Sequence, residues 1–128
     1  MEEQHITWST LLDIAPDSIA DIQTCDGMYE RYLSWAQLTA ADEALLQPLG
    51  RLLPDSLDPA TTMETYEGSS YWSPEDPIAL AYYPYNGCQV FKKSDCESYY
   101  LVYTEWGGHA PEKRARLILK NLITAHTA

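Results

Sequence analysis

Basic residues are scarce in this chain, which has 8 Lys and Arg against 19 Asp and Glu and a net charge of −11. Such a field repels nucleic acid and anionic lipid over about one Debye length and attracts basic proteins. Direct binding to DNA, RNA or a membrane surface is therefore not expected. Many soluble domains have a low pI for solubility alone, so the charge by itself selects no function.

Long apolar runs are absent as well, because no stretch of about 18 apolar residues could span a membrane. The first residues, Met1 to His5, include two glutamates where a secretory signal would be basic and then apolar. Cys25, Cys88 and Cys96 form no CxxC pair and have no zinc-like spacing to histidine. We therefore expect a cytoplasmic protein with reduced thiols, no metal and no cofactor. A Cys88–Cys96 bridge across a hairpin is the alternative in an oxidising compartment.

Phenylalanine is nearly missing, with one residue against 10 Tyr and 4 Trp, yet 45% of the 128 residues are hydrophobic. This composition is too apolar for a disordered chain and fits one domain with one core. Tyr and Trp join a large apolar body to a polar tip, so they suit half-buried sheets and binding surfaces. We expect a single domain, residues 1–128, of the α+β class.

The first half of the sequence predicts helices. Ser9 is expected to cap a short helix that runs through Ala15 and ends before Pro16, which forbids easy continuation. A core-facing helix over 27–38 is indicated by three large residues at helical spacing: Met28, Tyr32 and Trp35. Thr39 with Asp42 resembles a capping box, which predicts a further helix. Its inward side would carry Leu45, Leu46 and Leu49.

The second half of the sequence predicts strands and a last helix. The Asn-Gly pair at 86–87 is the strongest short hairpin signal and would join strands at 78–83 and 88–92. Alternation over 99–106 predicts a third strand, which completes a three-stranded antiparallel meander. A proline at the first turn and a helical spacing of apolar residues predict a C-terminal helix over 111–125. That helix should pack on the sheet, with its basic residues outward: Lys113, Arg114, Arg116 and Lys120.

An acidic, proline-containing stretch over 54–77 separates the two halves, with six acids and no base. Long connections in compact domains are either functional or disordered, and the aromatic residues in this one argue against disorder. Aromatic side chains anchor interfaces, while carboxylates speed association with a cationic partner. The candidate partner-binding residues are therefore the acids and aromatics of this stretch: Asp55, Asp58, Glu64, Tyr66, Glu67, Tyr71, Trp72, Glu75 and Asp76.

Signals for catalysis are weak. Glu105 and His109 flank a Gly-Gly turn and could form an acid–base pair, although a tight turn explains the glycines more simply. The three cysteines lack the base or electropositive setting that a nucleophile needs. No calcium-loop pattern occurs. The sequence therefore favours a protein that is not an enzyme.

The function that size and charge favour is inhibition of a basic protein partner. The most concrete form is an immunity or antitoxin-type protein that neutralises a nuclease toxin by covering its nucleic-acid cleft. The likeness is compositional and involves no motif. Three alternatives stay open: a DNA-mimic or antirestriction regulator that binds several DNA-binding proteins, an acidic secretion chaperone, and an enzyme using Glu105 and His109.

Overall fold

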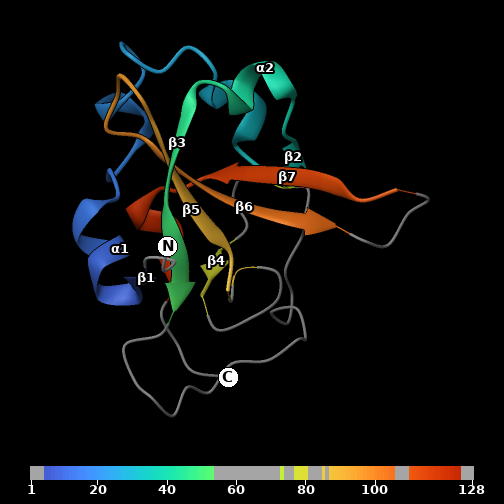
Figure 1. Cartoon of the computed structure of the whole chain (residues 1–128). Coiled ribbons are helices and arrows are strands. Elements are labelled where there is room, and N and C mark those ends of the chain that lie inside the picture. The colour runs from blue at the N-terminus through green and yellow to red at the C-terminus, as the bar shows by residue number, and fades with distance from the viewer. Residues whose placement is uncertain are drawn as a thin grey trace.

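The computed structural model describes residues 5–53, 73, 77–80, 85, 87–105 and 110–124. Most of these residues belong to a six-stranded mixed sheet with the strand order β1-β3-β5-β6-β7-β2 (Figure 1). Each of its four central strands is antiparallel to the next: β3 (Leu46–Leu53), β5 (Gln89–Lys93), β6 (Tyr99–Glu105) and β7 (Glu112–Leu117). The edges are β1 (His5–Thr7), parallel to β3, and β2 (Ala36–Gln37), antiparallel to β7.

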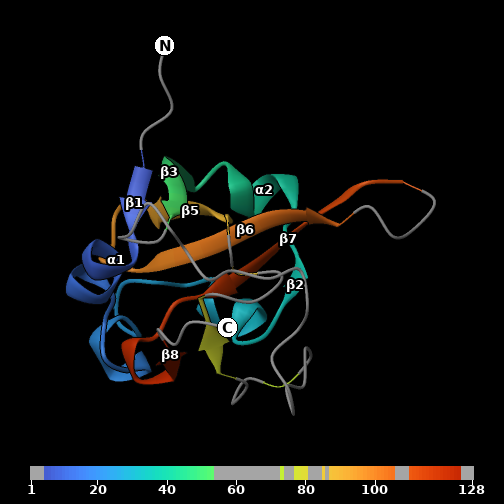
Figure 2. The ribbon, with the colours of Figure 1, turned by 90° about the horizontal axis from the view of Figure 1, so that it is seen from below.

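Helix is a minor part of the described structure. The α-helices are α1 (Trp8–Ile14) and the single turn α2 (Ala40–Glu43), and the 3₁₀ turns are η1 (Ile19–Asp21), η2 (Tyr29–Tyr32) and η3 (Lys120–Leu122). A second sheet pairs β4 (Ile78–Ala79) with β8 (Ile123–Thr124) in parallel, below β6 and β7 in Figure 2. The expected fold, a helical first half with a three-stranded meander and a C-terminal helix, is therefore wrong.

Apolar side chains cover both faces of the central sheet. In β6, Tyr99 and Leu101 belong to a first core cluster, while Tyr100 and Val102 belong to a second one on the opposite face. The first cluster also contains residues of α1 and β4, and the second contains Tyr32 of η2. A strand that is buried on both faces reads as a nearly continuous apolar run.

The C-terminal helix expected over 111–125 is wrong, because residues 112–117 form β7. β7 pairs with β6 along its whole length and with β2 at Arg114 and Ala115, so it takes its hydrogen bonds from the sheet. The apolar residues 115 and 117–119 are all buried there. Arg116, expected on an exposed helix face, is completely buried. Tertiary pairing has overridden a helical propensity that is only a weak preference.

The helix expected over 27–38 is also wrong, although its three large residues are buried as predicted. Met28 and Tyr32 lie in the second cluster, whereas Trp35 lies in the first. A continuous helix would place residues at this spacing on one face. The chain instead makes η2 and then passes along the edge of the sheet as β2.

Two helix starts were predicted more closely. The short first helix is confirmed as α1, although the cap is Thr7, whose side chain accepts from the N–H of Thr10 at 3.2 Å. The cap at Thr39 is confirmed, since its Oγ1 accepts from the N–H of Asp42 at 3.1 Å. That helix nevertheless ends at Glu43, and the leucines expected on it belong to β3 or precede it.

The strands at 88–92 and 99–106 are confirmed as β5 and β6, but the hairpin at 86–87 is wrong. β5 pairs with β3 and β6, and the short strand β4 pairs with β8 instead. A register shift between Pro48 and Gly50 lets β3 run along β5 despite a proline that has no N–H. The long-range partner β3 therefore takes the place that a local hairpin would have filled.

Cys25 and Cys96 form a disulfide, with their Cα atoms 5.7 Å apart across 71 residues of sequence. The expectation of three reduced thiols is wrong, and so is the alternative Cys88–Cys96 pairing. Cys88 is a buried thiol, and burial raises its pKa far above the ordinary value. The bond joins the segment after η1 to the turn between β5 and β6. No spacing in the sequence indicates such a distant pair.

Candidate functional site

All nine predicted partner-binding residues belong to residues 54–76, the acidic segment, and lie outside the described residues. The chain enters this segment from β3 and returns to the described structure before β4 (Figure 1). Leu52 on one side, and Ile78 and Leu80 on the other, are completely buried in the first core cluster. Burial of such a side chain contributes about 1.5–3 kcal/mol. The acidic segment is thus joined to one core at both ends.

Charge is distributed unevenly between the acidic segment and the described residues, called the body below. The body holds all 8 basic residues and 11 of the 19 acids, so it carries −3 of the net −11. The other eight acids lie outside it, and six of them are in the acidic segment, which has no base. Ion pairs engage most cations of the body: Arg31–Asp42, Lys93–Asp95, Lys113–Glu43, Arg114–Glu112 and Lys120–Asp17. Charge in the body is therefore largely compensated locally.

Asp42, in α2, is a nearly buried carboxylate that accepts from Arg31 Nη1 at 2.8 Å and from the hydroxyl of Tyr32 at 2.6 Å. Burial works to raise its pKa, but the hydrogen bonds from Tyr32 and Arg31 outweigh burial and hold the pKa below its ordinary value. Burial and the same carboxylate raise the pKa of Tyr32. These contacts connect α2 to η2, so Asp42 has a structural role.

Asp26 is a second buried carboxylate, with 1% of the residue exposed. It accepts from the hydroxyl of Ser98 at 2.6 Å, from the hydroxyl of Tyr100, and from the N–H of Met28 at 2.8 Å. Burial, together with the bond to Asp26, raises the pKa of Tyr100. The role of Asp26 is to hold the segment beside Cys25 against β6.

The acid–base pair considered from the sequence is not assembled in the described residues, because His109 lies outside them. Glu105 accepts from the hydroxyl of Tyr103 at 2.9 Å and lies 3.9 Å from Arg114 Nη1. Arg114 also binds Glu112, two residues before it on β7, with its Nε 2.7 Å from the carboxylate. Glu105 is thus engaged in a cross-strand network, and the absence of an enzymatic role stays a prediction.

A buried polar cluster around Tyr85 was not indicated by the sequence. The hydroxyl of Tyr85 accepts from Nη1 of Arg116 and from Nε1 of Trp35 at 3.2 Å. Trp35 in turn packs edge-on against Tyr103, with ring centroids 4.8 Å apart. Arg116 was assigned to an outer helix face, and only its place in β7 turns it into the core. The cluster thus connects β7 to Tyr85, which precedes β5 in the chain.

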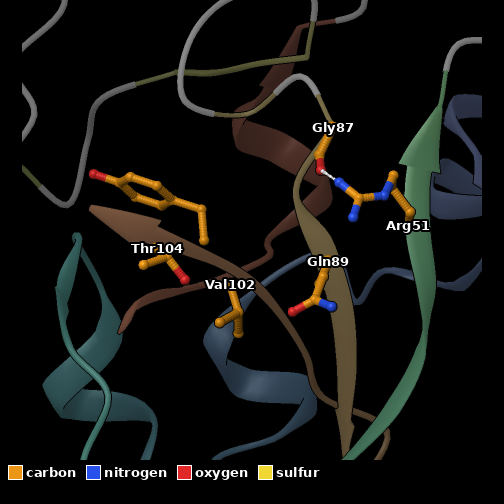
Figure 3. Close-up of a pocket in the computed structure, with 6 residues that line it drawn as sticks. Arg51, Gly87, Gln89, Val102 and Thr104 are labelled. Atoms are coloured by element: carbon orange, nitrogen blue, oxygen red, sulfur yellow. Dashed lines mark hydrogen bonds between the residues drawn. The ribbon is translucent and has the colours of Figure 1, made fainter. Parts of the chain in front are cut away.

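A pocket of about 330 Å³ opens at one end of the sheet (Figure 3). Its described lining comes from β3, β5, β6 and the turn before β5: Arg51, Gly87, Gln89, Val102, Tyr103 and Thr104. Arg51 reaches from β3 toward β5 and donates from Nη1 to the carbonyl of Gly87 at 2.9 Å. The sequence did not indicate this pocket, because its residues meet only through strand register. Arg51 was notable only as one of two bases in the first 91 residues.

Other kinds of site find no support in the described part of the chain. No three His, Cys, Asp or Glu side chains there are grouped to hold a metal ion. None of the helices in the same residues is long and apolar enough to cross a bilayer. Comparison of the chain with known protein families, with curated proteins and with solved structures finds no match.

Proposed function

We propose that this protein binds and inhibits a basic protein, as an immunity or antitoxin-type protein that neutralises a nuclease toxin. The observation that carries the proposal is the separation of charge. Cations and carboxylates of the body pair with one another, whereas the acidic segment has six carboxylates and no base. A basic partner is therefore attracted to one segment of the chain more than to the body.

The anchoring of the acidic segment supports the same proposal. Long-range attraction raises the rate of association, and this gain falls as salt is added. Affinity after the encounter needs aromatic anchors, which Tyr66, Tyr71 and Trp72 would supply. Both ends of the segment join one core through Leu52 and Ile78, so the body limits how far the segment's ends separate. Less ordering entropy is then lost on binding than for a free peptide.

The Cys25–Cys96 bond bears on the compartment in which the protein would meet its partner. A cytoplasmic protein was expected, but disulfides form in oxidising compartments and are rare in the reducing cytosol. We therefore propose that inhibitor and partner meet where the bond is stable. Alkylation of thiols in intact source cells, followed by mass measurement of the protein, tests this placement. Alkylation of all three cysteines in most molecules would restore the cytoplasmic expectation.

The test of the function begins with affinity capture from a nuclease-treated lysate of the source cells at low salt. One basic protein retained stoichiometrically supports the proposal, and its nuclease activity should fall when this protein is added. Retention of several DNA-binding proteins would favour the DNA-mimic alternative. A client bound only when unfolded would favour the chaperone alternative. If the folded protein retains nothing from cells that express the partner, the proposal is contradicted.

The captured partner then permits a matched charge test. Reversal to lysine of three acids in the segment, Glu67, Glu75 and Asp76, should lower the association rate constant by at least about tenfold at low salt. The control reverses three acids of the body and changes the net charge equally: Asp13, Asp17 and Glu30, all exposed. A smaller effect is expected for the control. Equal effects of the two triple variants would show that net charge, and not the segment, drives association.

A further inference from the structure

A segment before η2 covers the second core cluster without joining either sheet. Residues 17–28, called the strap below, contain the 3₁₀ turn η1 and no strand. Backbone N–H groups of the strap donate to acceptors at most four residues away, such as the carbonyls of Ser18, Ile19 and Ile22. Figure 1 shows the strap in blue, at the same end of the molecule as the turn between β5 and β6. Within the described residues, these N–H groups therefore make no hydrogen bond to the sheet.

Side chains attach the strap to the body at few points. Three of its residues are buried, and the others are wholly or partly exposed. Ile22 and Met28 lie in the second core cluster, with 1% and 4% of each residue exposed. The carboxylate of Asp26 accepts the two hydroxyl hydrogen bonds described above. The pair between Asp17 and Lys120, at 3.8 Å, is exposed and contributes little.

A covalent bond adds to these contacts, because Cys25 of the strap is joined to Cys96 in the turn between β5 and β6. Opening of the strap would separate Ile22 and Met28 from the core. Cys25 lies between these two residues and would stay beside Cys96, so the opened strap would consist of two short loops with little freedom. Closure of a loop of about 15 residues, close to the length of the strap, corresponds to about a hundredfold in an equilibrium constant. The bond therefore suppresses opening of the strap by about this factor.

The two halves of the bond differ in their access to solvent. Cys25 is exposed, whereas 5% of Cys96 is exposed, so a reductant reaches the bond from Cys25. One thiolate of a dithiol reductant attacks the sulfur of Cys25, and Cys96 leaves as a thiolate that takes up a proton. The second thiolate of the reductant attacks the reductant's own sulfur in the mixed disulfide, and Cys25 leaves and is protonated. The protein disulfide thus gains two electrons and two protons, while the dithiol becomes a disulfide.

We propose that the Cys25–Cys96 bond is a redox-sensitive latch on the strap. A dithiol reductant lets this segment open and uncovers the second core cluster, while the sheet stays folded. The sheet is independent of the strap because its central strands pair with one another and the first core cluster lies on its opposite face. A reducing compartment thus gives a form with accessible apolar surface, and an oxidising compartment gives the closed form. The latch does not depend on the proposed partner.

Hydrogen exchange of the folded protein, followed by ¹H–¹⁵N spectra at several low urea concentrations, tests the latch. The reporters are the amides of Asp26 and Met28 in the strap and of Leu101, which is paired on both sides in β6. Dithiothreitol should speed exchange of both strap amides by at least about a hundredfold. In the reduced protein, the opening equilibrium of the strap amides should exceed that of Leu101 by at least about tenfold and should not depend on urea, since local opening exposes little surface.

Thermolysin gives a second readout, because it cleaves before large apolar residues and the strap contains Ile22 and Met28. Cys25→Ala should be cut at these residues at least about tenfold faster than the oxidised wild type. Leu101→Ala is the matched control, since it removes a buried side chain from the opposite core cluster and leaves the bond and the strap unchanged. Its strap should be cut more slowly than that of Cys25→Ala.

Three results would overturn the latch. If the strap amides and Leu101 share one opening equilibrium in the reduced protein at every urea concentration, the bond supports the whole domain. If reduction leaves the exchange of Asp26 and Met28 unchanged, the other contacts hold the strap closed. Equal cleavage of the strap in Leu101→Ala and Cys25→Ala would attribute the opening to lost stability alone. The exchange experiment uses the wild type, so it decides the question even if a variant fails to fold.

Discussion

Removal of the Cys25–Cys96 bond is expected to lower the free energy of unfolding by about 4 kcal/mol. The two residues are 71 positions apart, and closure of a loop of this length restricts the unfolded chain. The chain-entropy relation gives about 3 kcal/mol for 15 residues and about 4.7 kcal/mol for 100. Cys25 is exposed, so Cys25→Ala leaves no cavity in the core and isolates the effect of the cross-link. Since a domain has about 5–15 kcal/mol in all, the loss is large.

Urea unfolding followed by tryptophan fluorescence measures this loss in the wild type and in Cys25→Ala, each with and without a reducing agent. The reduced wild type should coincide with the variant, and reductant should not change the variant. The melting temperature should fall by roughly 15 °C. Denatured, unreduced wild type should titrate one thiol, Cys88. Three titrated thiols, or a stability change below about 1 kcal/mol, would refute the reasoning.

Two further predictions concern the buried carboxylates. Asp26→Asn should cost about 1–3 kcal/mol in urea unfolding, because its two hydroxyl donors lose a charged acceptor, while Asp13→Asn on the surface should change stability by less than about 0.5 kcal/mol. Burial works to raise the pKa of Asp42, but the hydrogen bonds from Tyr32 and Arg31 outweigh burial, so the folded-state pKa lies below the unfolded one. The stability that Asp42 contributes is therefore fully present above about pH 4 and is lost as the pH falls through the folded-state pKa. Tyr32→Phe should make this acid loss smaller between pH 6 and pH 2, and equal losses in both proteins would contradict the assignment.

Local signals in the sequence predicted some parts of the structure correctly. The cap at Thr39 needs only a hydroxyl three residues before an N–H, which is a local arrangement. The strand over 99–105 combines aromatic and β-branched residues over a length typical of strands. Burial of Met28, Tyr32 and Trp35 follows from their size and apolar surface, whatever the backbone conformation. The concentration of six acids without a base in 54–76 is likewise a property of the sequence alone.

Tertiary structure decided the remaining features, because they depend on residues distant in sequence. Residues 112–117 are a strand since the edge of β6 offers hydrogen bonds that outweigh a weak helical preference. Cys25 meets Cys96 only because the folded chain brings the segment after η1 to the turn between β5 and β6. The row of Arg51, Gln89 and Val102 depends on register across three strands, and a slip of one residue would move each side chain to the other face. Composition thus set the charge and the large core residues, while long-range strand pairing set the fold and the pocket.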